Sequence, residues 1–198
     1  MLTYRLVGIL YLKIYNINMD KTKDKILNVS RDLFMKKGYD ATSMSAIADK
    51  VGINKSSLYY FFEDKEHLYF EIMRGALQNI IDYLKKVENT GNYNFANIIE
   101  NLIKISAKDS IIAYILDTDS IDHKSKSMME IHRGVAEIQE VFERICKKNG
   151  HKEPHVSSEV TLNAIHAYTI KSSCRSVDIG PKKYAQYLSR LLDKNNNK

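Results

Sequence analysis

Hydroxyl and cationic side chains crowd a short stretch that is predicted to form a helix. Its polar residues are Lys55, Ser56, Ser57, Tyr59 and Tyr60. A lysine at a helix start can reach a guanine edge or a phosphate, and serine and tyrosine hydroxyls can donate to phosphate oxygens. The two aromatic rings also offer apolar faces to a thymine methyl group. This set of side chains indicates contact with double-stranded DNA.

Two short helices joined by a turn must position these side chains. Apolar residues at i, i+3, i+4 and i+7 predict the first helix, and these are Met44, Ile47, Ala48 and Val51. A short hydroxyl at Thr42 or Ser43 can cap its start. Gly52 supplies the backbone freedom for a tight turn, and Asn54 can cap a second helix over residues 55–62. This is the helix-turn-helix arrangement, which places its second helix in the DNA major groove.

Three residues outside the second helix are further candidates for DNA contact. Thr42 and Ser43 precede the first short helix, and the free backbone amides of a helix N-terminus attract phosphate. Lys65 stands at the start of the next predicted helix and adds a full positive charge. Leu58 and Phe62, four residues apart, are expected to face the core instead.

A gap-free pattern covers over a quarter of the chain, from about residue 21 to residue 77. Its members are Ile26-Leu27, Leu33-Phe34, Lys37-Gly38-Tyr39, Ala41-Thr42-Ser43, Ile47-Ala48, Val51-Gly52-Ile53, Lys55, Leu58-Tyr59-Tyr60, Phe62 and Lys65-Glu66-His67-Leu68. In these residues the chain resembles the N-terminal domain of the tetracycline-repressor-like (TetR) family of bacterial regulators. The resemblance supports the candidate DNA contacts position by position. Phe61 stands where the family often has histidine, so we leave it out of the predicted site, and Ser56 stands where glycine is common.

Helix-favouring sequence extends through the rest of the chain. With two prolines and eight glycines in 198 residues, and almost no alternating strand pattern, we predict an all-α fold. The predicted domains are an extra N-terminal segment over 1–18, a helix-turn-helix domain over 19–66, and a helical ligand-binding and dimerisation domain over 67–194. The predicted longer helices cover residues 22–37, 65–87, 95–116 (whole, or interrupted near residue 108), 128–148, 156–173 and 181–192. A polar break at 89–92 is the expected seam between domains, and the tail after Asp193 is expected to be disordered.

Residues 1–18 are apolar and aromatic and do not fit the family pattern. Three alternatives stay open: an overlong gene assignment with initiation at Met19, an N-terminal arm that packs on the body or touches DNA, and a membrane-surface anchor. The apolar run over residues 6–12 is too short to span a bilayer, and no small-residue cleavage site follows it. We predict no membrane partner and a cytoplasmic location.

The prediction that the chain binds DNA does not rest on its net charge. The net charge is +6, but residues 20–70 hold nine basic and eight acidic side chains, which is a net charge of only +1. Cys146 and Cys174 show no metal-ligand spacing. They are expected to be reduced thiols, either as small buried hydrophobes or as a redox switch.

The C-terminal half gives weaker signals. The resemblance implies a small-molecule pocket there, and it implies a homodimer whose last two long helices pair across a twofold axis. The helix over 156–173 is apolar around most of its circumference, so it is expected to be buried on more than one side. Candidate ligand contacts are polar or polarisable residues on apolar helices: Tyr114, Met128, His132, Phe142, His166 and Tyr168. For each of them the alternative is a side chain that fills the core or a satisfied polar group at an interface.

Catalytic and metal-binding patterns are missing from the sequence. No Gly-rich phosphate loop, nucleophile elbow or HExxH motif occurs, so we predict no enzyme activity and no cofactor. The acidic residues and histidines between 117 and 132 match no ligand motif and are expected to be a solvated loop. The predicted function is a homodimeric repressor that a small molecule releases from a palindromic operator. The alternative is a helix-turn-helix protein without a small-molecule inducer, controlled by a protein partner.

Overall fold

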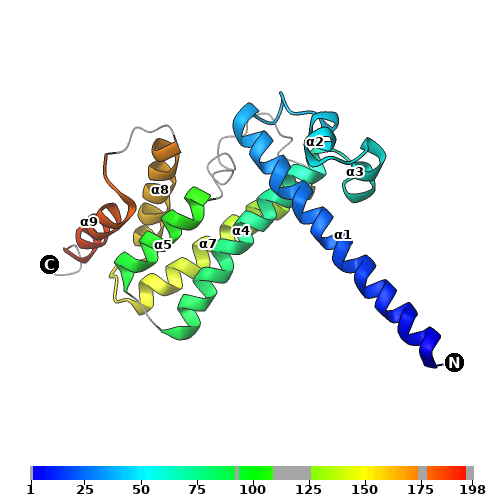
Figure 1. Cartoon of the computed structure of the whole chain (residues 1–198). Helices are drawn as coiled ribbons and strands as arrows, with labels where there is room; N and C mark the ends of the chain where they lie inside the picture. The colour runs from blue at the N-terminus through cyan, green and yellow to red at the C-terminus, as the bar shows by residue number, and fades with distance from the viewer. Residues whose placement is uncertain (1, 92–93, 109–125, 174–177, 195–198) are drawn as a thin grey trace. The chain divides into compact units, whose positions relative to one another are not determined.

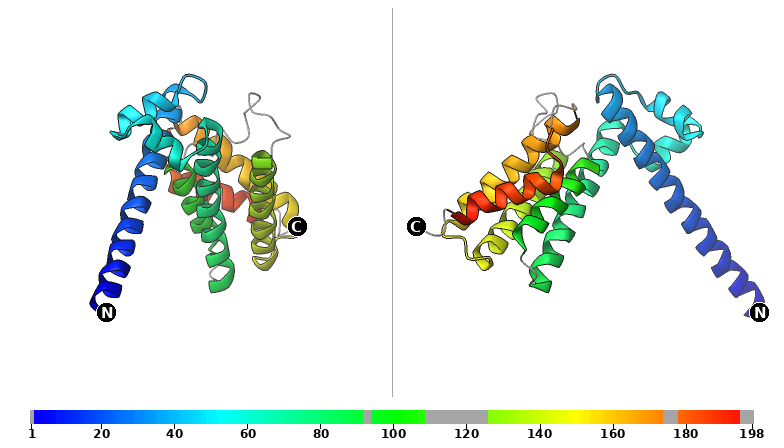
Figure 2. Two further views of the ribbon diagram at one scale, coloured as in Figure 1. Left: turned by 90° about the vertical axis from the view of Figure 1, so that its right-hand side faces the viewer. Right: turned by 60° about the vertical axis from the view of Figure 1, so that its left-hand side comes forward.

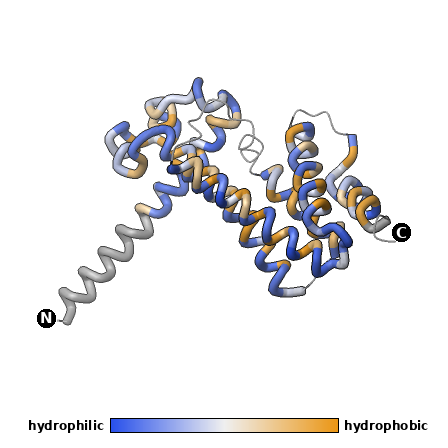
Figure 3. Tube along the Cα trace, turned by 180° about the vertical axis from the view of Figure 1, so that it is seen from behind, coloured by the Kyte–Doolittle hydropathy of each residue, from blue (hydrophilic) through white to orange (hydrophobic). Residues whose placement is uncertain are grey.

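In the computed structural model, the described residues 2–91, 94–108, 126–173 and 178–194 form helices and connecting turns, with no strand (Figure 1). The helices are α1 (Leu2–Lys37), α2 (Met44–Val51), α3 (Lys55–Phe61), α4 (Lys65–Thr90), α5 (Phe95–Lys108), α7 (Lys126–Lys148), α8 (Pro154–Ser173) and α9 (Pro181–Lys194). Apolar positions recur along the helices from residue 19 onward, as amphipathic helices require (Figure 3). The predicted all-α fold is confirmed.

The first helix is longer than predicted. Its expected start at residue 22 is wrong, because α1 begins at Leu2. The segment contains no proline and only one glycine, Gly8, so nothing in the backbone stops the helix before the chain end. The other end is as predicted: Gly38 adopts φ 81° and donates its N–H to the Phe34 carbonyl over 2.9 Å. A left-handed glycine after the last helical turn is a common helix stop.

The chain divides into two compact units, Met1–Ile72 and Met73–Lys198, and the division falls within α4. The predicted boundary after residue 66 lies a little earlier in the same helix. α4 continues to Thr90, so the polar residues from 89 onward close this helix and do not mark the division. α5 covers Phe95–Lys108, and residues 109–116 of the predicted helix lie outside the described residues.

The first unit is built around large side chains from each of its helices. Ile26, Ile47 and Leu58 are completely buried, and Phe62, the residue that caps α3, is only 1% exposed. Leu58 and Phe62 therefore face the core as predicted. Burial of such side chains contributes about 1.5–3 kcal/mol each, which holds two very short helices in place.

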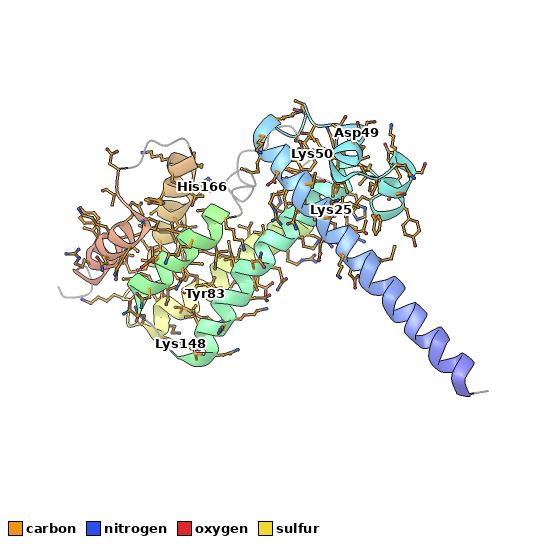
Figure 4. The ribbon with its side chains drawn as sticks, viewed as in Figure 1. Lys25, Asp49, Lys50, Tyr83, Lys148 and His166 are labelled. Atoms are coloured by element: carbon orange, nitrogen blue, oxygen red, sulfur yellow. The ribbon has the colours of Figure 1, made fainter. Side chains whose placement is uncertain are left out.

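The second unit packs α5 against both α8 and α9, and α7 against α8 (Figure 2). Its centre contains Phe95 of α5 stacked on Phe142 of α7, with ring centroids 5.7 Å apart. Ion pairs join the surfaces of α4 and α7, such as Lys85–Glu137 at 2.6 Å and Arg144–Glu88 at 2.9 Å. The hydrogen bond from Arg144 lowers the pKa of Glu88, so its contribution is present above the ordinary carboxylate pKa and fades as the pH falls. Lys148 lies 3.4 Å from the same carboxylate, near the end of α7 (Figure 4).

Gly52 and Gly75 allow a matched test of the turn. Gly52 has φ 81° and Gly75 lies in the interior of α4, and neither would bring a new Cβ within 4 Å of another atom. Gly52→Ala should therefore lower the free energy of unfolding by about 1–2 kcal/mol through backbone strain alone. Gly75→Ala should raise it by about 1 kcal/mol. Urea denaturation followed by circular dichroism measures both, and a Gly52→Ala chain as stable as the original would contradict the role of this turn.

Candidate nucleic-acid interface

Local hydrogen bonds fix the two short helices of the first unit. The Ser43 side chain accepts from the Ala46 N–H over 3.2 Å, and the Asn54 side chain accepts from the Ser57 N–H over 2.7 Å. Between them, Gly52 donates its N–H to the carbonyls of Ala48 and Asp49. Both predicted caps and the glycine turn are confirmed. The backbone has the helix-turn-helix arrangement, with α3 in the place of the recognition helix.

One face of α3 is buried and the other is open. Leu58 is fully buried, whereas Tyr60 is 71% exposed and Tyr59 44% exposed. Lys55 and Ser56 are also exposed, and Ser57 is half-buried. The structure thus gathers five of the predicted contacts on one exposed stretch of α3 and leaves their hydroxyls and charge accessible.

Neighbouring groups restrict where the α3 side chains can lie. The Lys55 ammonium lies 5.8 Å from the centre of the Tyr59 ring, and the half-buried Phe61 ring meets Tyr60 edge-on with centroids 5.5 Å apart. Phe61, which has no donor for a phosphate, thus contacts the exposed Tyr60 ring. Its position supports leaving it out of the predicted DNA contacts.

Lys65 has an inward partner that the sequence did not indicate. Its ammonium donates to the Tyr39 carbonyl over 2.9 Å and lies 4.1 Å from the centre of the Tyr39 ring. This contact joins the start of α4 to the loop between α1 and α2, across 26 positions of sequence. The predicted phosphate contact of Lys65 would have to compete with this hydrogen bond.

The Tyr39 ring completes a small aromatic cluster. Its centroid lies 5.7 Å from that of Phe34 and 4.9 Å from that of Tyr69. Burial, with smaller contributions from nearby carboxylates led by Glu66, raises the pKa of Tyr39 to about 12. The phenol is therefore neutral at any pH at which DNA is bound, and Lys65 faces an uncharged ring.

Thr42 also points inward. Its side chain is 2% exposed, and its hydroxyl donates to the Gly38 carbonyl over 2.8 Å. Its backbone N–H is bonded to the Tyr39 carbonyl. These bonds favour a structural role for Thr42 in the loop before α2 over the predicted DNA contact. Ser43, one residue on, stays exposed.

A cavity of about 400 Å³ lies in the second unit. Its wall is mostly apolar, with a few polar groups, and is formed by Leu77, Ile80, Leu102, Ser106, His132, Val135, Ala136, Ile138, Gln139, Glu159, Leu162, Asn163, Ile165, His166 and Thr169. Of the predicted ligand contacts, His132 and His166 line it, and His166 on α8 is marked in Figure 4. A mostly apolar hollow with a few polar groups is typical of a small-molecule site.

Three other predicted ligand contacts belong to the core instead. Met128 and Phe142 are at most 1% exposed, and neither lines the cavity. Tyr168 is 6% exposed and donates its hydroxyl to the Ile179 carbonyl over 2.7 Å. Their side chains were chosen for polarity or polarisability, but helix packing turns them away from the hollow. Tyr114 lies outside the described residues.

The two cavity histidines lie on helices that run antiparallel. Gln139 of α7 donates to Ser158 of α8 over 2.6 Å, and Glu143 pairs with His155 over 2.9 Å. In this register a higher residue number on α7 meets a lower one on α8, so His132 and His166 fall at the same level. The structure therefore offers a bound molecule two imidazoles beside an apolar wall.

The structure also bears on the predictions for the cysteines, for metal ligands and for a membrane span. Burial raises the pKa of the Cys146 thiol to about 12, which keeps it protonated and fits the buried-hydrophobe alternative. Within the described ranges, no group of three or more potential metal ligands occurs, and no helix is long and apolar enough to cross a bilayer. Cys174 and the acidic loop at 117–123 lie outside those ranges.

Comparison with known proteins identifies the first unit. Residues 26–72 match the family model of bacterial regulatory proteins of the tetR family. Residues 26–72 form a TetR-family N-terminal domain. The biofilm operon negative transcriptional regulator IcaR of Staphylococcus epidermidis is 35% identical over 82 residues, and its counterpart in Staphylococcus aureus strain Newman is 33% identical over 82. The match covers 41% of this chain and 44% of each relative, so it spans less than half of their length.

Solved structures share the fold over most of the chain. A transcriptional regulator of Aquifex aeolicus VF5 has a TM-score of 0.69 at 21% identity, covering 88% of this chain and 99% of that one. AibR, solved in complex with isovaleryl coenzyme A and operator DNA, has a TM-score of 0.71 at 17% identity, covering 86% and 97%. At such identities the similarity establishes a TetR-type fold for both units and nothing finer.

The inward bond of Lys65 leads to a stability prediction. Lys65→Ala removes a charged hydrogen bond and a cation–π contact, so it should lower the free energy of unfolding by about 1–2 kcal/mol. Lys55→Ala, at an exposed position on α3, should leave stability unchanged within a few tenths of a kcal/mol. Thermal denaturation measures both variants. An unchanged stability for Lys65→Ala, together with a salt dependence of DNA binding reduced by about one unit, would support the phosphate contact instead.

Proposed function

We propose that this chain is a homodimeric DNA-binding transcriptional repressor. The proposal rests mainly on the exposed face of α3. A glycine turn and two caps hold this helix so that Lys55, Tyr59 and Tyr60 face out. Two features of its relatives support it. IcaR is named as a negative transcriptional regulator, and AibR was solved with operator DNA. We infer cytoplasmic action on double-stranded DNA for this chain as well.

The proposed DNA contacts are those of the exposed α3 face and its surroundings. Lys55, Ser56, Ser57, Tyr59 and Tyr60 lie on α3, and Ser43 adds its position at the start of α2. Thr42 and Lys65 have inward hydrogen bonds, so we give them positioning roles ahead of direct contact. A twofold dimer would present two copies of α3 to successive major grooves, about 34–36 Å or somewhat more apart, on a palindromic operator.

A small molecule in the cavity is the proposed signal for release. The cavity wall includes Leu77 and Ile80 of α4, and the same helix begins at Lys65 in the first unit. A ligand that favours one position of α4 would shift the α3 helices out of register with the grooves. A coupling of about 1–3 kcal/mol lowers affinity about 5–150-fold, which is enough for a switch.

The ligand is expected to combine an apolar body with a hydrogen-bonding group. Its apolar part would meet the leucines and isoleucines of the wall, and its polar group would meet His132 or His166. The structure of AibR with isovaleryl coenzyme A shows that a protein of this fold can bind a molecule with a short acyl chain. Control by a protein partner alone is less well supported, since that alternative does not use the cavity.

Exposed apolar residues on α8 and α9 support the homodimer. Val156 and Val160 of α8 and Tyr187 and Leu191 of α9 are each between 45% and 60% exposed. The sequence predicted that α8 is buried on more than one side, but in a single chain one of its apolar sides remains open. A second copy would cover that side.

Two substitutions separate recognition from folding. Tyr60→Ala should weaken operator binding without loss of thermal stability, because the ring is 71% exposed.

Lys55→Ala should reduce the salt slope of binding to an arbitrary duplex by about one unit. Lys86→Ala, an exposed position on α4 in the second unit, is the matched charge control and should change neither quantity. Fluorescence anisotropy at several salt concentrations measures the slopes. Equal slopes for the unsubstituted, Lys55→Ala and Lys86→Ala chains would contradict α3 as the DNA-facing helix.

A further inference from the structure

The cavity of the second unit has a buried apolar part and an exposed polar part. Among the residues that line it, Leu77, Leu102 and Ile165 are at most 4% exposed. Glu159 and Asn163 of α8 also line it, and both are exposed. A molecule bound here can therefore bury an apolar body and keep a polar group beside these two side chains.

One carboxylate sets the charge of the cavity wall. Among the described residues that line the cavity, Glu159 alone carries a full formal charge, and none is lysine or arginine. The imidazoles of His132 and His166 can each donate or accept a hydrogen bond. The described wall thus offers a ligand a negative charge and hydrogen-bonding groups, but no fixed positive charge.

A second carboxylate lies near the same stretch of α8. Glu143 of α7 pairs with His155 of α8 over 2.9 Å. This hydrogen bond raises the pKa of His155, and the nearby charge of Glu159 raises it further. Two carboxylates thus lie near one imidazole, so this end of α8 remains negative even when His155 is protonated.

Glu159 and the two cavity histidines lie toward opposite ends of the cavity. Glu159 precedes His166 by seven residues on α8, which is about two helical turns or about 10 Å. Gln139 of α7 lies at the Glu159 end, because it bonds to Ser158 over 2.6 Å, whereas His132 lies level with His166 (Figure 4). The wall between the two ends is mostly apolar. A ligand that reaches both ends therefore needs an apolar body about two helical turns long.

We propose that the cavity takes an organic cation, an amine whose ammonium group lies beside Glu159 and whose apolar body lies along Leu162 toward the histidines. This rests on the proposed role of the cavity as the ligand site. The ammonium group would donate to the Glu159 carboxylate, and Gln139 offers its amide oxygen as a further acceptor at the same end. A carboxylate or phosphate ligand would instead place a like charge beside Glu159, which is unfavourable where no cation balances it.

Three probes with the same alkyl chain test the preferred charge: octylamine, octanol and octanoate. At neutral pH they are positive, neutral and negative, whereas their apolar parts are alike. Isothermal titration calorimetry with the unsubstituted chain should give octylamine a dissociation constant at least about tenfold lower than that of octanoate, with octanol between them. Octylamine that binds no more tightly than octanol or octanoate would overturn the proposal.

Glu159→Gln tests the position of the ammonium group. The substitution keeps the size of the side chain and removes its charge, so the affinity for octylamine should fall at least about fivefold and that for octanol should not change. Glu140→Gln is the matched control, because Glu140 is an exposed carboxylate on α7 that does not line the cavity, and it should change neither affinity. Equal octylamine affinities for the unsubstituted, Glu159→Gln and Glu140→Gln chains would overturn the assignment to Glu159.

Leu162→Trp distinguishes a failure of this proposal from a failure of the ligand site. Leu162 is a half-buried part of the cavity wall, and a larger ring there should weaken the binding of all three probes. If it does so while the unsubstituted chain shows no preference for octylamine, the cavity stands as a ligand site and only the cation falls. If no probe binds the folded, unsubstituted chain, or if a folded Leu162→Trp chain binds all three as before, the ligand site fails and the cation proposal with it.

Discussion

The left-handed backbone at Gly52 is the constraint on which the DNA-facing surface depends. At φ 81° the chain reverses within a few residues, and the Gly52 N–H still satisfies carbonyls at the end of α2. The reversal lets the buried face of α2 share one core with Leu58 of α3. Since one side of α3 is held in this way, its opposite side must face solvent, and Tyr60 is the most exposed ring there. An L-residue at this position would strain the turn that makes the arrangement possible.

In the second unit, α8 has different surroundings on its different faces. This helix buries one face, lines a cavity with another and leaves the side chains of Val156 and Val160 exposed. A ligand that enters the cavity and a second copy that covers these valines would therefore touch the same helix. α4 supplies Leu77 and Ile80 to the same cavity. In our proposal, α4 and α8 are therefore the helices through which ligand binding, dimer formation and DNA binding are linked.

Local signals made much of this predictable from sequence. Caps at Ser43 and Asn54 and the turn at Gly52 each depend on residues within four positions, and all three are confirmed. Contacts between distant segments were not predictable, such as the bond from Lys65 to Tyr39 across 26 positions. The cavity shows the same limit: polarity suggested both His166 and Tyr168, and only the rotation of α8 within its packing decides that His166 lines the hollow. The early start of α1 at Leu2 has no positive signal in the sequence, since only the absence of a helix breaker over residues 2–21 favours it.

The sharpest test of α3 as the helix that recognises DNA is the selection of DNA fragments from a random pool by this chain. We expect enrichment of one palindromic sequence whose half-sites lie about one helical turn apart or somewhat more. The Tyr60→Ala chain should enrich that sequence far less, although it remains folded. No enrichment by a folded, dimeric chain would contradict the DNA-binding role of α3, and so would equal enrichment by the Tyr60→Ala chain.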